Sequence, residues 1–350
     1  MENPSVTNFR EYIQINTMQP KPDYASAVVW LKKQAEELSG EFNVTECVPG
    51  KPIVIITING KNPQLPSILL NSHIDVVPVF PEHWKHDPFS AHKDEKGDIY
   101  GRGTQDMKCV AVQYIEALKE FKKEGIQFLR TFHLSFVPDE EIGGKDGMAK
   151  FLETKTFKNL NVGFGLDEEL NVKCPGPPGH GSQFIENTAG QKIRKVINSF
   201  MSFRDSEEKR LKSDPNLDLG DVTTVNLTIL GEFDKTIRDW CKEAGEDITI
   251  EPFQLDMIQD TTCVEDGKNA WWDAFRTACE KEKLKLTKKI FPAGTDSRYL
   301  RGKGIPALGF SPMNHTPILL HDHNEFLNEK IFLRGIQIYK TIISHIGNLP

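Results

Sequence analysis

The chain has 350 residues, with 43 Lys and Arg against 50 Asp and Glu and a net charge of −7. Its 38% of hydrophobic residues suffices for a sizeable core and excludes a disordered chain. The length exceeds the roughly 250–300 residues at which one core tends to split, so we expect two domains. Mild acidity without a long Lys/Arg stripe argues against a nucleic-acid partner.

Three further classes of feature are missing from the sequence pattern. Residues 1–10 lack the basic and apolar regions of a signal peptide, and the apolar stretches fall short of the ~18–20 residues that span a bilayer. We therefore expect a cytoplasmic protein with no membrane partner. The six cysteines have no CxxC spacing, which favours reduced thiols over disulfides or a cysteine zinc site.

Helical and strand patterns alternate in the first half of the chain, which is typical of a sheet covered by helices on both faces. Apolar spacing predicts a helix over residues 24–38, with Asp23 as its N-cap, and another over residues 107–124. Four apolar runs predict strands, at residues 51–59, 67–71, 130–137 and 162–166.

The pattern changes where prolines and glycines crowd residues 175–179. After them we expect a small α+β unit, with helices at 188–210 and 235–244 and strands at 222–230 and 248–253. The first pattern then returns, with a helix at 269–281, strands near 286–291 and 305–310, and a closing helix at 329–346. The predicted fold class is α/β, with a larger domain of residues 1–170 and 256–350 and a small inserted domain of residues 171–255.

Acidic and imidazole side chains follow several predicted strands, at the edge of an open α/β sheet where sites are built. In chain order they are His73 and Asp75, Asp106, Glu140 and Glu141, Asp167, and His321. Singly, each has a structural alternative, such as a hydrogen-bonded histidine at a strand end, a helix N-cap or a solvated acidic turn. Together they form a ligand set suited to a dinuclear zinc or manganese site, with Asp75 able to hold the second ring nitrogen of His73.

Four runs of sequence resemble the zinc aminoacylase/carboxypeptidase family: SHIDVVP at 72–78, GRGTQDMK at 101–108, DEEIGG at 139–144 and PGH at 178–180. The resemblance covers nearly the whole chain. It implies a zinc-exopeptidase-like fold with a mixed central sheet and an inserted lid and dimerisation domain. It also implies a homodimeric metallohydrolase with two zinc ions, which cleaves the amide bond of small N-acyl, mainly N-acetyl, L-amino acids.

The resemblance also assigns roles to the residues of the site. It implies that His73 and Asp167 hold one zinc ion, that Glu141 and His321 hold the other, and that Asp106 bridges both. Glu140 would be the general base, with Asp75 assisting catalysis, and a cis peptide bond would follow Asp106. His321 is preferred to His323 because the family's ligand stands four or five positions before a glutamate, here Glu325.

Two substrate-binding residues are expected, each with a structural alternative. Arg298 lies in a run, residues 293–299, that resembles the family's substrate-binding loop, and it would pair with the free α-carboxylate. The alternative is a structural ion pair with Asp296 or another acid. His180 matches a histidine that reaches the partner subunit's active site in relatives, where it stabilises the oxyanion, but by sequence alone it is a turn histidine.

The inserted domain departs from the family pattern. Relatives have four strands and two helices there, whereas residues 171–255 predict both helices but only two strands, so we expect a truncated domain. Missing strands leave unpaired edges, which puts the homodimer in doubt. Two alternatives therefore remain open: another exopeptidase or deacylase of the same family, and a non-catalytic form that binds metal.

Overall fold

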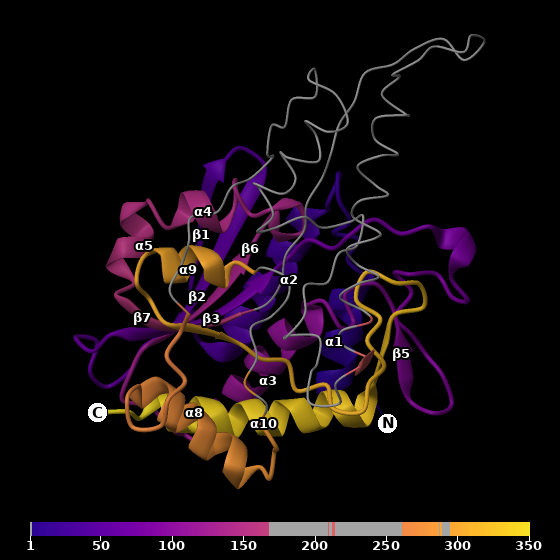
Figure 1. The fold of residues 1–350 in the computed structure, drawn as a ribbon. Coiled ribbons are helices and arrows are strands. Elements are labelled where there is room, and N and C mark those ends of the chain that lie inside the picture. Colours follow the sequence, from indigo (N-terminus) through magenta and orange to yellow (C-terminus); the bar gives the residue numbers. More distant parts are fainter. Residues whose placement is uncertain (1, 168–208, 210–211, 214–260, 287, 289–294) are drawn as a thin grey trace. The chain divides into compact units, whose positions relative to one another are not determined.

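The computed structural model describes residues 2–167, 209, 212–213, 261–286, 288 and 295–350 (Figure 1). Contacts divide the chain into one unit of residues 1–169, 258–288 and 295–350 and another of residues 170–257 and 289–294. The strands predicted at 222–230 and 248–253, the helix predicted at 235–244 and nearly all of the helix predicted at 188–210 lie outside the described residues, as does His180.

A six-stranded mixed sheet, in the order β1-β2-β6-β3-β7-β8, forms the centre of the first unit. The pairs β1–β2 and β2–β6 are antiparallel, whereas β6, β3, β7 and β8 run parallel to one another. The strands are β1 (Glu41–Val48), β2 (Lys51–Ile58), β3 (Ser67–His73), β6 (Phe132–Val137), β7 (Val162–Asp167) and β8 (Ala307–Gly309). A small antiparallel sheet joins β4 (His92–Lys93), β5 (Asp98–Tyr100) and β9 (Phe326–Asn328).

Helices cover both faces of the mixed sheet, which confirms the predicted fold class (Figure 1). One face packs against α1 (Pro4–Gln14), α2 (Tyr24–Leu38), α3 (Lys108–Lys123), α8 (Ala270–Lys281) and α10 (Glu329–Gly347). The other packs against α4 (Met148–Phe151), α5 (Lys155–Asn159) and α9 (Ser297–Gly302). Two short 3₁₀ helices, η1 (Pro81–His83) and η2 (Glu140–Ile142), lie in loops.

The apolar run of β2 shows why this sheet needs two helical layers. Successive strand side chains point to opposite faces, so Val54 and Ile56 join the core on one side while Ile53 and Ile55 join the core on the other. All four are at most 2% exposed. A strand buried on both faces reads as a continuous apolar run, and this run made the strand predictable.

Most predicted elements of the first unit are present, with small shifts at their ends. Asp23 caps α2 as predicted, accepting a hydrogen bond from the Ser26 backbone N–H at 3.0 Å. The apolar spacing that predicted α2 included Val29, but this side chain is 72% exposed because the stacking of Trp30 on Tyr12, at 4.3 Å, fixes the buried face of the helix. The sequence patterns missed α1 and β1; β1 is an edge strand with no fully buried residue.

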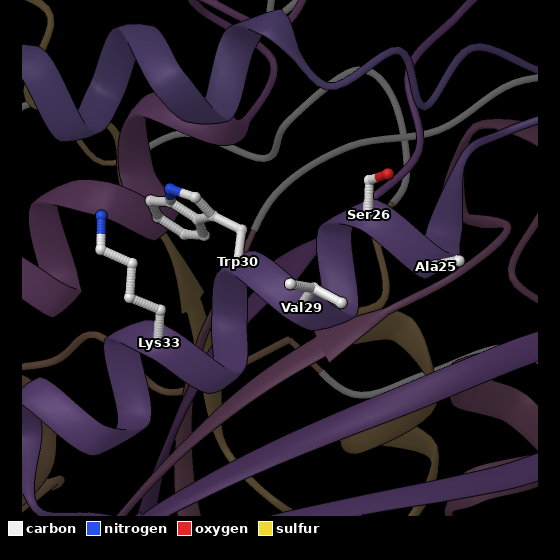
Figure 2. Close-up of a pocket in the computed structure, with 5 residues that line it drawn as sticks. All are labelled: Ala25, Ser26, Val29, Trp30 and Lys33. Carbon is white, nitrogen blue, oxygen red and sulfur yellow. The ribbon is translucent and has the colours of Figure 1, made fainter.

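The outer side of α2 carries a pocket with a volume of about 410 Å³. Figure 2 shows its lining, in which Val29, Trp30 and Lys33 lie along the helix together with Ala25 and Ser26. Lysine is its only ionisable lining residue, so the pocket holds none of the predicted catalytic side chains.

Two other sequence expectations concern cysteines and membrane segments. Among the described residues, Cys47, Cys109, Cys263 and Cys279 are free thiols, as predicted. In the same part of the chain, none of the helices combines the length and apolarity needed to cross a membrane.

The buried imidazole of His133, on β6, makes the stability of the fold depend on pH. The ring Nε2 lies 3.1 Å from the Leu160 carbonyl, to which it donates, and Nδ1 lies 2.9 Å from the Thr57 hydroxyl. Burial lowers the pKa of His133 from 6.5 to about 4. The unfolded chain therefore binds a proton at a higher pH than the folded chain does.

We expect this histidine to remove up to about 3 kcal/mol of stability as the pH falls from about 6.5 to 4. Urea unfolding across this range, compared between the parent protein and His133→Gln, measures the contribution, because glutamine does not titrate. The variant is less stable at neutral pH, but its stability falls less steeply with acid. Equal slopes in the two proteins would contradict a neutral buried ring.

Candidate metal centre

The predicted metal ligands meet at one edge of the mixed sheet. His73 is the last residue of β3 and Asp167 the last residue of the neighbouring parallel strand β7. Glu140 and Glu141 open η2, just beyond the end of β6. Because β3, β6 and β7 are parallel, their carboxyl ends lie at the same edge, where open α/β sheets build their sites.

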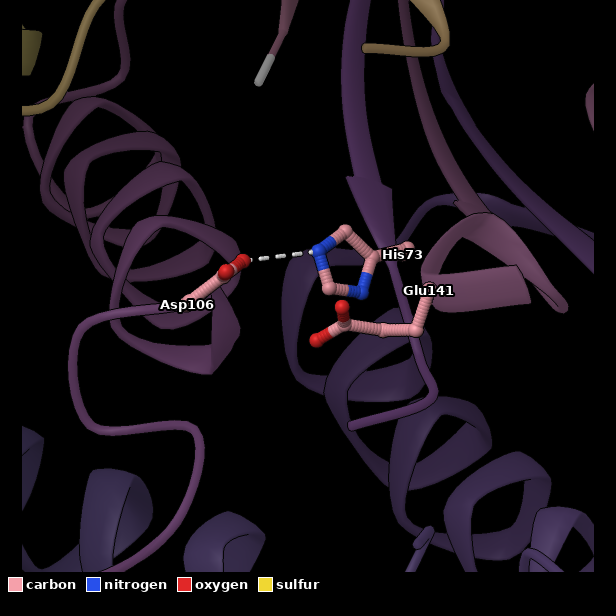
Figure 3. A group of neighbouring side chains, drawn as sticks. All are labelled: His73, Asp106 and Glu141. Atoms are coloured by element: carbon pink, nitrogen blue, oxygen red, sulfur yellow. Dashed lines mark hydrogen bonds and ion pairs between the residues drawn. The ribbon is translucent and has the colours of Figure 1, made fainter. Parts of the chain in front are cut away.

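Asp106 lies between two histidines, His73 and His321, that are far apart in the sequence. Its Oδ1 is 3.0 Å from His73 Nε2, and its Oδ2 is 3.1 Å from His321 Nε2. Glu141 Oε2 is also 3.1 Å from His321 Nε2. Figure 3 shows the side chains of His73, Asp106 and Glu141 near one another. One ligand atom from each of the three lies within 4.8 Å of the others. Each oxygen of Asp106 thus faces a different histidine, as expected of a carboxylate that bridges two ions.

The peptide bond between Asp106 and Met107 is cis, as the family resemblance implied. The backbone at His321 has φ +61°, in the left-handed region that non-glycine residues rarely adopt. His321 contacts Asp106 and Glu141. The centroid of the His323 ring instead lies 4.9 Å from that of His83.

The electrostatics of this cluster favour cations. Burial disfavours a charged imidazole at His73, but Asp106 and its neighbouring glutamates raise the pKa of the ring well above its ordinary value. The pKa of His321 rises to about 11 because hydrogen bonds to Asp106 and Glu141 outweigh burial. Burial and the charge of Asp106 raise the pKa of Glu141 to about 7. Without metal, protons on the histidines offset the buried negative charge.

Several buried carboxylate oxygens have no hydrogen-bond donor within the described part of the chain. They are Glu140 Oε1, Glu141 Oε1 and both side-chain oxygens of Asp296. Burial and nearby Asp167 raise the pKa of Asp296 to about 8. Buried acids are normally paired or bound to metal. The unpaired oxygen of Glu141, together with Asp106 and the imidazoles of His73 and His321, forms a donor set that fits divalent metal ions.

Asp75 contacts the second ring nitrogen of His73, as predicted, and it does so through its backbone. The structure places the Asp75 backbone carbonyl, not its carboxylate, 2.8 Å from His73 Nδ1; the carboxylate is 3.9 Å away. Its oxygens instead accept the backbone N–H groups of Glu140, at 3.1 Å, and Glu141, at 3.3 Å. Free N–H groups at the start of a helical turn need acceptors, and Asp75 supplies them. Gln19 donates to the same carboxylate at 2.8 Å.

Asp167 is oriented by two residues that the sequence reasoning missed. Asn71 Nδ2 donates to Asp167 Oδ1 at 2.6 Å, and the Ser135 hydroxyl donates to Asn71 Oδ1, also at 2.6 Å. The chain of bonds runs across β6, β3 and β7, and both supporting residues are fully buried. The sequence could have indicated both residues, because each is a polar residue inside an otherwise apolar buried strand.

Arg298 lies against the turn that carries the two glutamates. Its Nη2 donates to the Gly143 carbonyl at 2.9 Å, and the Tyr299 hydroxyl donates to the same oxygen at 2.6 Å. Arg298 is only 3% exposed. The predicted pairing with a substrate carboxylate stays a prediction, and the contact with Gly143 adds a role in holding η2 that the sequence did not indicate.

Residues 69–345 match the model of peptidase family M20/M25/M40, and the chain belongs to this family. Its fold resembles an M20 metallo-carboxypeptidase from Sulfolobus solfataricus, with a TM-score of 0.71 and 16% identity, covering 99% of this chain and 100% of that one. A dinuclear metal-binding M20 peptidase from Bacillus subtilis gives a TM-score of 0.57 and 14% identity, and the match covers 98% of this chain and 97% of that one. At such identities the likeness shows the fold.

The sequence is much more similar to that of aminoacylase-1 of Mus musculus. The two are 47% identical over 395 aligned positions, which cover 100% of this chain and 97% of the mouse protein. This agrees with the family resemblance seen in the motifs. Because this chain has 350 residues, it lacks residues that the mouse protein has within the matched region.

The link between Asn71 and Asp167 can be tested by replacing the amide with a side chain of similar size. Asn71→Leu removes the donor to Asp167, and we expect the metal-free protein to lose about 1–3 kcal/mol of stability. Zinc affinity at the position of His73 and Asp167 should fall about 10- to 100-fold, because such supporting bonds orient metal ligands.

Urea unfolding of the metal-free protein and calorimetric zinc titration measure the two effects of this substitution. Ser135→Ala is the matched control, because it keeps the bond between Asn71 and Asp167 and removes only the donor behind it. We expect a smaller loss of affinity for this control. Parent-like zinc binding by Asn71→Leu would show that the bond does not orient Asp167.

Proposed function

We propose that this chain is a zinc-dependent amidohydrolase that converts N-acyl, mainly N-acetyl, L-amino acids into a carboxylate and a free L-amino acid. The observation that carries the proposal is the buried Asp106, whose two oxygens face His73 and His321, in a chain 47% identical to aminoacylase-1 over its whole length. Such a centre suits hydrolysis of an amide, and the similarity points to this class of amide.

The same five residues that the motifs singled out would hold two divalent metal ions. One position would be formed by His73 and Asp167, the other by Glu141 and His321, with Asp106 shared between them. When bound, two zinc ions supply Lewis-acid activation of water and of the amide carbonyl. Mixed imidazole and carboxylate donors support zinc, and the same donors suit manganese.

Glu140 has the features of a general base and acid. Its backbone N–H is fixed by Asp75, its side chain is 3% exposed, and its Oε1 has no donor among the described residues. Burial raises the pKa of Glu140 well above its ordinary value, opposed by His73 and reinforced by Asp296. A carboxylate held in this position can accept a proton from water and return it to the departing amine.

Recognition of the substrate is proposed from the family resemblance. Arg298 would pair with the α-carboxylate, and its contact with Gly143 supports this by placing it beside the turn that carries Glu140. His180 would stabilise the oxyanion from a partner subunit. A homodimer and a cytoplasmic location stay predictions, as do the domain boundaries and the truncation of the inserted domain.

The shorter length of the chain favours one alternative, a form that binds metal without catalysing hydrolysis. The test is to purify the full chain and measure zinc per chain, oligomeric state, and hydrolysis of N-acetyl-methionine and of dipeptides. We expect two zinc ions, a dimer and a preference for N-acetyl-methionine, with activity lost on chelation and regained with zinc. Preference for dipeptides would indicate another exopeptidase. Two zinc ions without hydrolysis or a dimer would support the non-catalytic form.

The role of Glu140 has its own test. Glu140→Gln keeps the shape of the side chain but cannot accept a proton, so we expect turnover to fall about 10²–10⁴-fold. Zinc content should match that of the parent protein, because Glu140 is not one of the proposed ligands. Steady-state kinetics and metal analysis on the same preparation separate the two effects. Near-normal turnover in this variant would refute the assignment.

A further inference from the structure

Asp106 and His321 come from segments that are far apart in the chain and have little secondary structure of their own. Asp106 ends the loop of residues 101–106, just before α3, and His321 lies between β8 and β9. Their side chains nevertheless meet at 3.1 Å. Ligands on loops need support from the surrounding structure to hold such a separation, and two buried side chains provide it here.

The first of these side chains is the amide of Gln105, which binds backbone on both sides of His321. Its Nε2 donates to the Pro317 carbonyl at 3.1 Å and to the Phe326 carbonyl at 2.8 Å. Its Oε1 accepts the Leu319 N–H at 3.0 Å. Gln105 is 2% exposed and directly precedes Asp106 in the chain. The residue next to one ligand thus holds the segment that carries another.

The second side chain is the carboxylate of Glu325, which makes the reverse connection. It accepts the Gln105 backbone N–H at 2.6 Å and the Gly103 N–H at 3.2 Å, and it pairs with the Arg102 guanidinium at 2.8 Å. Longer contacts, at 3.4 Å, reach the Asp106 N–H and the Thr104 hydroxyl. Glu325 is fully buried. The segment that carries His321 therefore holds the loop that presents Asp106.

The charge and location of these contacts connect them to the metal centre. Because Arg102 neutralises Glu325, the pair adds no net charge to the cluster of buried acids. The backbone of His321 is in the left-handed region, which a non-glycine residue keeps only when its surroundings hold it there. The contacts of Gln105 fall before and after this residue, so they restrain the strained segment at both ends.

We propose that Gln105 and Glu325 are positioning residues that set the separation of Asp106 and His321. They thereby fix the affinity of the metal position that His321 and Glu141 complete. The inference rests on the two-metal centre of the proposed function. It concerns metal binding rather than the chemical step, because the side chains of Gln105 and Glu325 are engaged with backbone groups and with Arg102.

The test compares two buried glutamines: Gln105, which precedes α3, and Gln113, which lies on α3. Gln105→Met removes the three bonds to the His321 segment, while Gln113→Met removes a buried bond from Gln113 Nε2 to the Phe332 carbonyl, at 3.0 Å, away from the centre. Calorimetric titration of each metal-free protein with zinc measures both binding steps. We expect Gln105→Met to weaken one step about 10- to 100-fold, with the other nearly unchanged. Gln113→Met should bind both ions like the parent protein.

A second pair of variants covers the case in which Gln105→Met does not fold. Glu325→Gln keeps the size of the side chain and one acceptor oxygen, and Glu116→Gln is its control. Glu116 is a buried carboxylate on α3 that accepts from Ser5, at 2.6 Å, and Asn8, at 2.9 Å, and pairs with Lys119. We expect both substitutions to lower stability by comparable amounts. Only Glu325→Gln should weaken the binding of the second zinc ion and alter the absorption spectrum of bound cobalt.

The outcomes separate this inference from the proposed function. Fewer than two zinc ions on the parent protein would contradict the two-metal centre, and with it the positioning role. Two ions on the parent, together with unchanged binding in the folded Gln105→Met or Glu325→Gln variant, would contradict the positioning role alone. Equal losses in these variants and in their controls would show a purely structural effect on stability, and would also overturn it.

Discussion

The site depends on one interaction, the placement of a buried carboxylate, Asp106, between two imidazoles. Its oxygens face His73 and His321 at 3.0 and 3.1 Å, while Glu141 adds a second acid to His321. Buried acids at such separations repel one another unless positive charge lies among them. Against the effect of burial, Asp106 and the neighbouring glutamates raise the pKa of His73, so this environment favours a cation. The same attraction would bind metal ions in place of protons.

Keeping these acids in position requires donors that are not themselves ligands. Asn71 holds Asp167 from the next strand, and Asp75 holds the turn of Glu140 and Glu141 through their backbone N–H groups. The parallel strands bring the ligands to one edge of the sheet, and these bonds then fix each carboxylate. The fold therefore acts at two levels: topology brings the ligands together, and buried hydrogen bonds set their geometry.

The two levels differ in how far the sequence predicts them. His73, Asp167 and the glutamates of η2 could be found because they follow apolar strands, whereas the family resemblance was needed to assign Asp106 and His321, which lie in loops. The α/β order followed from runs such as that of β2. Gln105 could not be found in this way, because its partners are backbone atoms more than 200 residues away, which leave no mark in the sequence pattern. The contacts of the Asp75 carboxylate could not be found in this way either, because they serve backbone N–H groups of a turn whose shape no pattern reveals. Val29 shows the limit for helices, where stacking of Trp30 on Tyr12 overrides apolar spacing.

The division of the chain into two units separates metal binding from turnover. All the predicted metal ligands lie in the unit of residues 1–169, 258–288 and 295–350, as do the donors that orient them, whereas His180 belongs to the other unit. The proposed metal positions therefore draw their ligands from the first unit. The chain is shorter than aminoacylase-1 within their matched region. If the missing residues fall in the inserted domain, as the sequence predicts, the loss would act on the proposed role of His180 and on the proposed dimer, and it would leave the proposed metal ligands in place. A chain of this kind can bind its metal ions fully while its rate of hydrolysis is reduced.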